Sequence, residues 1–163
     1  MDEKDLQILQ LLEENSRTPT ADLATMTELS KKEVTARIAK MEKARVIRSY
    51  STVVDWERVG NGEVLAIIDL KVAPERDFGY ERIAERIARF RQVRSLRLVT
   101  GVYDLQLLVA GKTMQEVARF VSEQIAPMDQ IRETATHLIM KIYKENGILF
   151  VEREGAERLP FSF

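Results

Sequence analysis

The sequence contains no cysteine and only one histidine, His137, and both shortages narrow its chemistry. Without cysteine there are no disulfides, thiolate nucleophiles or cysteine-ligated metal centres. A single histidine also excludes metal sites that need several histidine ligands. No apolar run approaches the roughly 18–20 residues that cross a bilayer. The stretch Met1-Asp2-Glu3-Lys4 is acidic and lacks the apolar segment of a secretory signal. We therefore expect a cytoplasmic protein with no membrane partner, no metal and no cofactor.

The charge of the chain is nearly balanced overall but uneven along its length. The 163 residues carry 25 Lys+Arg against 26 Asp+Glu, and the 45% hydrophobic fraction is typical of a globular protein. Residues 16–50 hold eight basic against four acidic residues, whereas residues 1–15 hold one lysine against five acids. A basic segment in a neutral chain indicates either a surface that binds a polyanion or a solvated helix face, and charge alone does not separate the two.

The first thirty residues have the pattern of two helices. Residues 4–14 place their leucines and isoleucine over a broad apolar face, which predicts a helix. Thr18-Pro19 has the form of an N-cap followed by proline at the first helical position, where the missing N–H costs nothing. A short second helix is then expected to run to about Met26, followed by a tight connection, Thr27-Glu28-Leu29.

A third helix is predicted to begin after Ser30. Ser30 and Glu33 have the spacing of a capping box, in which each side chain bonds the other residue's backbone N–H. One stripe of this helix is apolar, with Val34, Ile38 and Met41 at helical spacing. The opposite stripe combines small and basic side chains: Lys32, Ala36, Ala39 and Lys43.

Two short helices joined by a three-residue turn form a helix-turn-helix pattern. Small side chains let a helix approach a major groove closely, and lysines reach phosphates. The alternative is a three-helix bundle with a solvated third helix. Because the outer face lacks side chains that read bases by paired hydrogen bonds, affinity is expected to come largely from phosphates and DNA shape. The predicted contacts to double-stranded DNA are Ser30, Lys31, Lys32, Thr35, Ala36, Arg37, Lys40 and Lys43. Arg37 lies near the edge of the apolar stripe, so packing is the alternative to a phosphate contact there.

The remainder of the chain alternates strands and helices. The segment 46–54 is rich in β-branched residues and is expected to be extended, and Gly60-Asn61-Gly62 marks a hinge. Asn146-Gly147 favours a type I′ hairpin turn, after which Ile148–Val151 is predicted to pair back as a short fifth strand. The other predicted elements are strands at 64–72, 93–100, 105–110 and 131–143, and helices at 80–90 and 114–125.

The order βαββαβ predicts a ferredoxin-like antiparallel sheet with both helices on one face. The strand at 131–143 has substantial apolar content on both sides. One side carries Thr134, Thr136, Leu138, Met140 and Ile142, and the other carries Ala135, His137, Ile139 and Tyr143. One side packs on the helices, and the other is expected to pack on a second copy of the chain. A dimer suits a helix-turn-helix protein, because it grips two half-sites.

Four segments together resemble the Lrp/AsnC, or feast/famine, family of transcriptional regulators, and the resemblance covers nearly the whole chain. They are Leu6–Leu12, Leu29-Ser30 followed by Val34–Ile38, Val46–Tyr50, and Val99–Asp104, whose end is similar to the family's G-x-[FY]-D turn. The chain departs from the family at Thr27-Glu28, where a turn containing glycine is common, and at Arg45, where many members have glycine.

The resemblance implies an α+β protein with a winged-type helix-turn-helix domain followed by a ferredoxin-like domain of the RAM/ACT-like kind. The expected parts are the DNA-binding domain 1–48, a linker 49–62, an effector-binding and oligomerisation domain 63–151, and a tail 152–163. It also implies dimers that assemble into tetramers or octamers, and regulation of amino-acid metabolism. The stretch from Tyr50-Ser51 to Asp55-Trp56 is similar to a branch linked to alanine metabolism.

In the family, an amino-acid effector binds near the turn at an interface between subunits. Physical reasons support such a site: Gly101 permits a tight turn with free N–H groups, and Asp104 can accept from an ammonium group. Threonine hydroxyls from a neighbouring subunit can complete it. An alternative for Asp104 is a carboxylate that caps its own turn. The predicted effector contacts are Thr100, Gly101, Val102, Tyr103, Asp104, Thr134 and Thr136.

Other functions remain as alternatives. An enzyme is disfavoured because no nucleophile–base pair, carboxylate pair or metal spacing stands out. An RNA-binding domain of the same strand order needs exposed aromatic residues on its central strands, and Leu105–Ala110 has none. An effector-independent DNA-binding or architectural protein, and an amino-acid-binding domain without a DNA function, stay open.

Overall fold

The computed structural model describes residues 1–60 and 62–151, which fall into two compact units. The first is Met1–Val53, and the second begins at Val54, within the predicted linker 49–62. The hinge residue Asn61 and the predicted tail 152–163 lie outside the described residues. The two units are described separately below.

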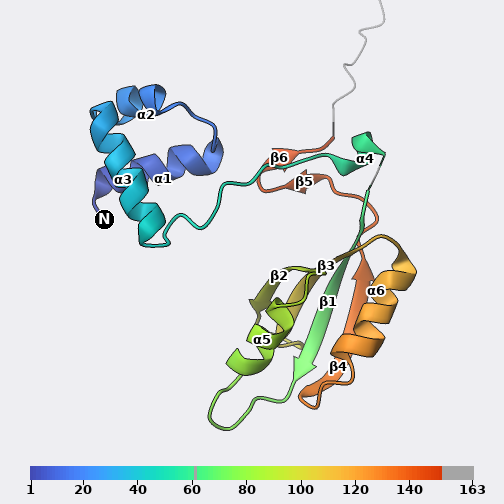
Figure 1. Ribbon diagram of the computed structural model, residues 1–163. Coiled ribbons are helices and arrows are strands. Elements are labelled where there is room, and N and C mark those ends of the chain that lie inside the picture. The colour runs from blue at the N-terminus through green and yellow to red at the C-terminus, as the bar shows by residue number, and fades with distance from the viewer. Residues whose placement is uncertain (61, 152–163) are drawn as a thin grey trace, which may run out of the picture. The chain divides into compact units, whose positions relative to one another are not determined.

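The first unit consists of three helices around a small core. They are α1 (Glu3–Glu14), α2 (Thr20–Thr27) and α3 (Lys31–Lys43) (Figure 1). The predicted apolar stripe of α3 is confirmed, because Val34 and Met41 are buried and Ile38 packs against the same core. The core is completed by side chains from the other two helices: Ile8, Leu23 and Ala24.

The predicted start of α3 is confirmed, whereas the predicted start of α2 is wrong. The capping box is confirmed, since the Ser30 hydroxyl accepts from the Glu33 N–H at 3.2 Å and Glu33 accepts from the Ser30 N–H at 3.0 Å. At α2, however, Pro19 is itself the N-cap residue rather than the first helical residue. The Thr18 hydroxyl donates back to the Asn15 carbonyl at 2.8 Å, so it does not cap α2.

Two residues of the first unit adopt left-handed backbone conformations without being glycine. Glu28 in the turn between α2 and α3 and Arg45 after α3 both have φ of 56°. These are the two places where the sequence departs from the glycine common in the resembling family. A side chain in this region costs roughly 1–2 kcal/mol relative to ordinary helical backbone, because Cβ crowds a carbonyl oxygen. The chain keeps the turn geometry at this cost.

The segment after α3 connects the two units without forming a strand. Residues 48–55 contain neither helix nor strand, so the expected winged-type domain has its three helices but no strand within residues 1–60. A single turn of helix, α4 (Trp56–Val59), follows this segment. Asp55 caps α4 by accepting from the Arg58 N–H at 3.2 Å, and Gly60 ends it in a left-handed conformation.

The second unit is a four-stranded antiparallel sheet with helices on one face. Its strands are β1 (Val64–Val72), β2 (Val93–Leu98), β3 (Leu105–Gly111) and β4 (Ile131–Leu138), in the spatial order β2-β3-β1-β4. Helix α5 (Glu81–Ala88) and helix α6 (Met114–Phe120), continued by the π-helical segment η1 (Val121–Ile125), cover the same face (Figure 1). The predicted ferredoxin-like order is confirmed.

Register decides which residues of the sheet face the helices. Ala66, Ile68 and Leu70 of β1 pair with Val109, Leu107 and Leu105 of β3, and all six are buried in the core under α5 and α6. On the other side, β1 pairs with β4 so that Thr134, Thr136 and Leu138 share this helix-facing side. The opposite face carries partly buried apolar side chains beside polar ones: Leu65, Ile67, Asp69, Gln106, Leu108, Ala135 and Ile139.

The end of the sheet differs from the prediction. Strand β4 ends at Leu138 instead of continuing to Tyr143. The turn at Asn146-Gly147 does form a hairpin, but it joins the short strands β5 (Lys144–Glu145) and β6 (Ile148–Leu149) as a separate two-stranded sheet. The predicted fifth strand therefore pairs within its own hairpin and not with the main sheet. Among the described residues, no helix is both long and apolar enough to span a membrane.

The left-handed Arg45 gives a test of local strain. Arg45→Gly removes the Cβ conflict at φ 56° while adding flexibility to the unfolded chain, and the expected net gain is about 0.5–1 kcal/mol. Thermal unfolding followed by circular dichroism without DNA should show a higher midpoint. Arg48→Gly, at a residue outside the left-handed set, is the matched control and should give no gain. An equal or lower midpoint for Arg45→Gly would show that the conformation carries no strain.

Candidate functional site

The outer face of α3 is an exposed basic surface. Lys32, Ala36 and Lys43 are exposed along one stripe, and Lys31 and Lys40 flank it. Within residues 1–60 and 62–151, none of these lysines forms an ion pair. Their ammonium groups are therefore available to phosphates, and the small Ala36 leaves room for close approach of the helix backbone.

Two other predicted DNA contacts, Ser30 and Thr35, have hydroxyls that form hydrogen bonds at the start of α3. The Ser30 hydroxyl donates to the Glu33 carboxylate at 2.7 Å within the capping box. The Thr35 hydroxyl donates to the Lys31 carbonyl at 2.9 Å. Both residues are exposed. These bonds tie the hydroxyls to the first turns of α3.

Arg37 is engaged by acidic side chains at the start of α1. Its Nη1 donates to the Asp2 carboxylate at 2.8 Å and to Asp5 Oδ1 at 2.7 Å. Hydrogen bonds from Arg37, followed by those from the backbone, hold the pKa of both carboxyls below their ordinary value. The same two carboxylates raise the pKa of Arg37. This geometry places Arg37 as a tie between α3 and α1, whereas the sequence grouped it with the phosphate contacts.

The turn between β2 and β3 is held by Asp104. Its carboxylate accepts from the Val72 N–H at 2.8 Å, from Lys71 Nζ at 3.3 Å and from the Tyr80 hydroxyl at 3.4 Å. The bond from Val72 is the largest cause of the lowered pKa of Asp104, and Lys71 and Tyr80 add to it. Asp104 thus fastens the turn to β1 and α5, rather than to its own backbone as the turn-capping alternative required.

The rest of the turn is more open. Gly101 has φ of 131°, and Thr100, Gly101 and Val102 are exposed. The Tyr103 hydroxyl donates to Glu133 Oε1 at 3.2 Å, which raises the pKa of the tyrosine. Among the described residues, the backbone N–H groups of Gly101 and Val102 have no backbone partner, so they can donate to an anionic group.

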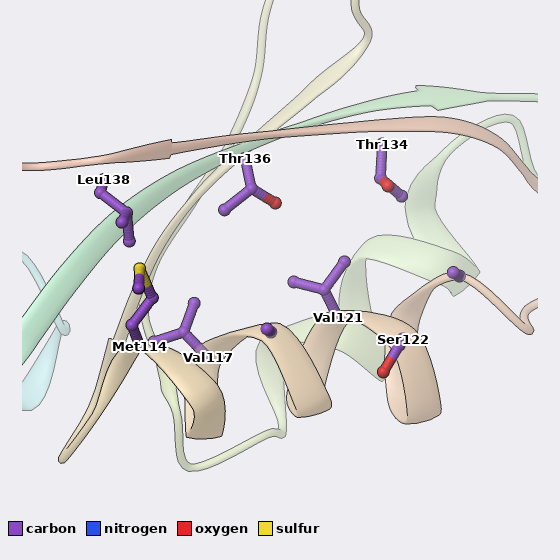
Figure 2. A pocket seen from close by; sticks show the side chains of 9 residues that line it. Met114, Val117, Val121, Ser122, Thr134, Thr136 and Leu138 are labelled. Atoms are coloured by element: carbon purple, nitrogen blue, oxygen red, sulfur yellow. The ribbon is translucent and has the colours of Figure 1, made fainter.

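The other two predicted effector residues lie in a groove between β4 and α6, called here the β4–α6 groove. Figure 2 shows Thr134, Thr136 and Leu138 pointing from β4 towards Met114, Val117 and Val121. The groove has a volume of about 440 Å³. Its remaining lining residues are Ala118, Ser122 and Ala126. Most of its surface is apolar, and the threonine hydroxyls form no hydrogen bond within residues 1–60 and 62–151.

Within one chain, the turn and the groove are separate. Leu105, which follows the turn, pairs with Leu70, and Leu70 pairs in turn with Thr134, so β1 lies between them. The helical wall of the groove was missed because the spacing of Met114, Val117 and Val121 is that of an ordinary core face. Its only sequence signal is that the facing strand carries threonines where a fully covered strand would carry aliphatic side chains.

Two family models match the chain over most of its length. The AsnC-type helix-turn-helix domain matches residues 1–42, and the Lrp/AsnC ligand binding domain matches residues 65–149. The chain belongs to the Lrp/AsnC family. This Lrp/AsnC protein is accordingly a DNA-binding transcriptional regulator and not an enzyme.

Curated relatives agree with the assignment to the Lrp/AsnC family. YugG of Bacillus subtilis (strain 168), an HTH-type transcriptional regulator, is 42% identical over 161 residues, covering 98% of this chain and 97% of its own. An HTH-type transcriptional regulator of Pyrococcus horikoshii is 30% identical over 144 residues, covering 88% and 89% respectively.

Solved structures of Lrp/AsnC proteins share the fold. An AsnC family regulator from Agrobacterium tumefaciens has a TM-score of 0.70 at 29% identity, covering 91% of this chain and 96% of its own. A transcriptional regulator from Neisseria meningitidis, solved as a complex with L-Met, has a TM-score of 0.70 at 25% identity, with coverage of 89% and 93%.

The tie between Arg37 and two aspartates predicts a pH-dependent stability. Because the folded pKa of Asp2 and Asp5 is lowered from 3.8, their stabilisation is present above 3.8 and is lost as pH falls through the folded pKa. Arg37→Gln should lower the unfolding midpoint at pH 7, and the gap to the unmodified chain should close below about pH 3.8. Arg17→Gln, an exposed arginine change, should show no such gap. A gap that persists at low pH would contradict the carboxylate tie.

The basic face of α3 predicts where DNA binds. Lys32→Glu with Lys43→Glu should weaken duplex binding at least tenfold and flatten its salt dependence, because phosphate contacts are lost. Fluorescence anisotropy at several salt concentrations measures both effects. The control, Lys112→Glu with Arg119→Glu, makes the same charge change on exposed residues of the second unit. Unchanged affinity of the α3 variant would contradict the assigned face.

Proposed function

We propose that this Lrp/AsnC protein is a sequence-specific regulator of genes of amino-acid metabolism, modulated by a small amino acid bound at a subunit interface. The observation that carries the proposal is the β4–α6 groove, in which an apolar cavity of about 440 Å³ carries two threonine hydroxyls without partners among the described residues. Ligand pockets commonly combine an apolar wall with a few polar groups that fix orientation.

The chemistry of the two predicted parts suits an amino acid with an apolar side chain. The apolar side chain of the amino acid would lie against Met114 and Val117. The hydroxyls of Thr134 and Thr136 would form hydrogen bonds with the polar end of the amino acid. Gly101 and Val102 lie in the turn of a neighbouring subunit in this arrangement, and their exposed N–H groups would donate to the carboxylate of the amino acid. Asp104 would act by holding the turn in shape, since its carboxylate is already occupied by Val72, Lys71 and Tyr80.

Self-association supplies the interface that this arrangement needs. The sheet face opposite the helices carries partly exposed Leu65, Ile67 and Leu108. On this face Asp69 Oδ1 accepts a hydrogen bond from Gln106 Nε2 at 3.0 Å, and Asp69 Oδ2 lies 3.5 Å from His137 Nε2. These polar side chains therefore have partners within the face. An apolar face with paired polar groups suits a second copy of the same face, giving a two-fold dimer that offers two α3 helices to DNA.

Regulation then follows from differential affinity. An effector that bridges two subunits binds one assembly better than another, and it can shift DNA binding only by that difference. The similar transcriptional regulator of Neisseria meningitidis, solved as a complex with L-Met, supports an amino-acid ligand for the second unit of this chain.

A thermal-shift screen of the twenty amino acids tests the effector, because a specific ligand raises the apparent stability. We expect at least one apolar amino acid to raise the midpoint and to change duplex affinity. Thr134→Val with Thr136→Val should weaken the binding of this amino acid, measured by calorimetry, at least tenfold. Valine keeps the shape of threonine but has a methyl group in place of the hydroxyl, so the hydrogen bond is lost.

Thr52→Val makes the same change outside the groove and serves as control. If the unmodified chain, the double variant and the control bind the amino acid equally well, the groove is not its binding site. A screen without any hit would favour an effector-independent regulator.

A further inference from the structure

The second unit contains an arginine-rich segment that the proposed function does not use. Residues 81–97 hold six arginines and two glutamates, so the nearly balanced second half of the chain contains a strongly basic stretch. Three of the arginines, Arg82, Arg86 and Arg89, fall at i, i+4 and i+7 along α5 and its C-terminal end. Side chains at this spacing lie on one flank of a helix.

This flank forms one wall of a pocket, called here the α5 arginine pocket. It has a volume of about 400 Å³, within the range of small-molecule sites. The arginines face Glu75 and Gln130, which come from the loop after β1 and the residues before β4, and the buried Ile83 contributes an apolar surface. Neither the β4–α6 groove nor the turn at Gly101 shares a residue with this pocket.

The loop wall of the pocket is already built. Glu75 and Gly79 exchange two backbone hydrogen bonds of 2.9 Å. The Glu75 carboxylate accepts from Gln130 Nε2 at 3.0 Å and from Arg82 Nη1 at 3.3 Å, so its two oxygens are both occupied. The Arg82 guanidinium lies 4.9 Å from the centre of the Phe78 ring, which helps to fix its position.

The other two arginines are left with unused donors. Arg82 neutralises Glu75, whereas Arg86 and Arg89 form no ion pair or hydrogen bond through their side chains within residues 1–60 and 62–151. Glu85 also lines the pocket and is exposed, so the lining carries three positive charges against two negative ones. Two guanidinium groups three residues apart can together grip one oxyanion, to which each offers a planar fork of N–H donors.

We propose that the α5 arginine pocket binds a small organic anion bearing a phosphate or carboxylate group. Arg86 and Arg89 hold the anionic group, and Arg82 and Glu75 fix the wall. Such a site would give the regulator a second small-molecule input, distinct from the β4–α6 groove. It does not depend on the proposed amino-acid effector, because no residue is shared.

Calorimetry on the full chain at constant ionic strength tests the site, with pyrophosphate as the phosphate probe and succinate as the carboxylate probe. Arg86→Gln with Arg89→Gln should weaken binding of the preferred probe at least tenfold. Both arginines are exposed, so the fold should be kept, and circular dichroism checks this. The control, Arg91→Gln with Arg119→Gln, removes equal charge from exposed arginines outside the pocket and should bind as the unmodified chain does.

The outcome also distinguishes the ligand classes. Binding of pyrophosphate alone assigns a phosphate ligand, and binding of succinate alone assigns a carboxylate ligand. The proposal is overturned if neither probe binds, or if the Arg86 and Arg89 variant binds the probes as well as the control does. It is also overturned if that variant loses only duplex affinity, because the two arginines would then contact DNA.

Discussion

Two helices can cover only one face of a four-stranded sheet, and this constraint shapes the second unit. Helices α5 and α6 pack on the face that carries Ile68 and Leu107, and these side chains are fully buried. The other face carries Ile67 and Leu108, which are only partly buried. Since apolar side chains on a sheet face are stabilised by removal from water, this face favours a second copy of the chain. The proposed two-fold dimer would cover the face that the helices leave exposed.

Incomplete covering by the helices also explains the β4–α6 groove and the α5 arginine pocket. Helix α6 approaches the edge strand β4 without filling the space over Thr134 and Thr136, and the β4–α6 groove results. On α5, Ile83 and Ile87 face the core while the arginine flank turns towards the loop of Glu75. The packing of the helices on the core thus sets where the groove and the pocket lie, and the N-terminal unit, with its own separate core, carries the exposed lysines of α3.

Local patterns and the order of the strands could be predicted from the sequence, whereas individual contacts between distant side chains could not. The capping box at Ser30 and the order of strands follow from short spacings, and both are confirmed. The left-handed Glu28 and Arg45 could be suspected only from missing glycines. Arg37 was grouped with the DNA contacts because its partners, Asp2 and Asp5, lie more than thirty positions earlier in the chain. The helical wall of the groove depends on where α6 lies over the sheet, which its spacing does not reveal.

Sedimentation velocity of the full chain and of Leu108→Glu tests most directly whether the helix-free sheet face joins two copies. The unmodified chain should sediment as a dimer or a multiple of dimers, and the charge placed on this face should produce monomers that keep their circular-dichroism spectrum. A monomeric unmodified chain at the concentrations where it binds a duplex would contradict the two-fold regulator. An unchanged assembly of Leu108→Glu would contradict the face assigned to it.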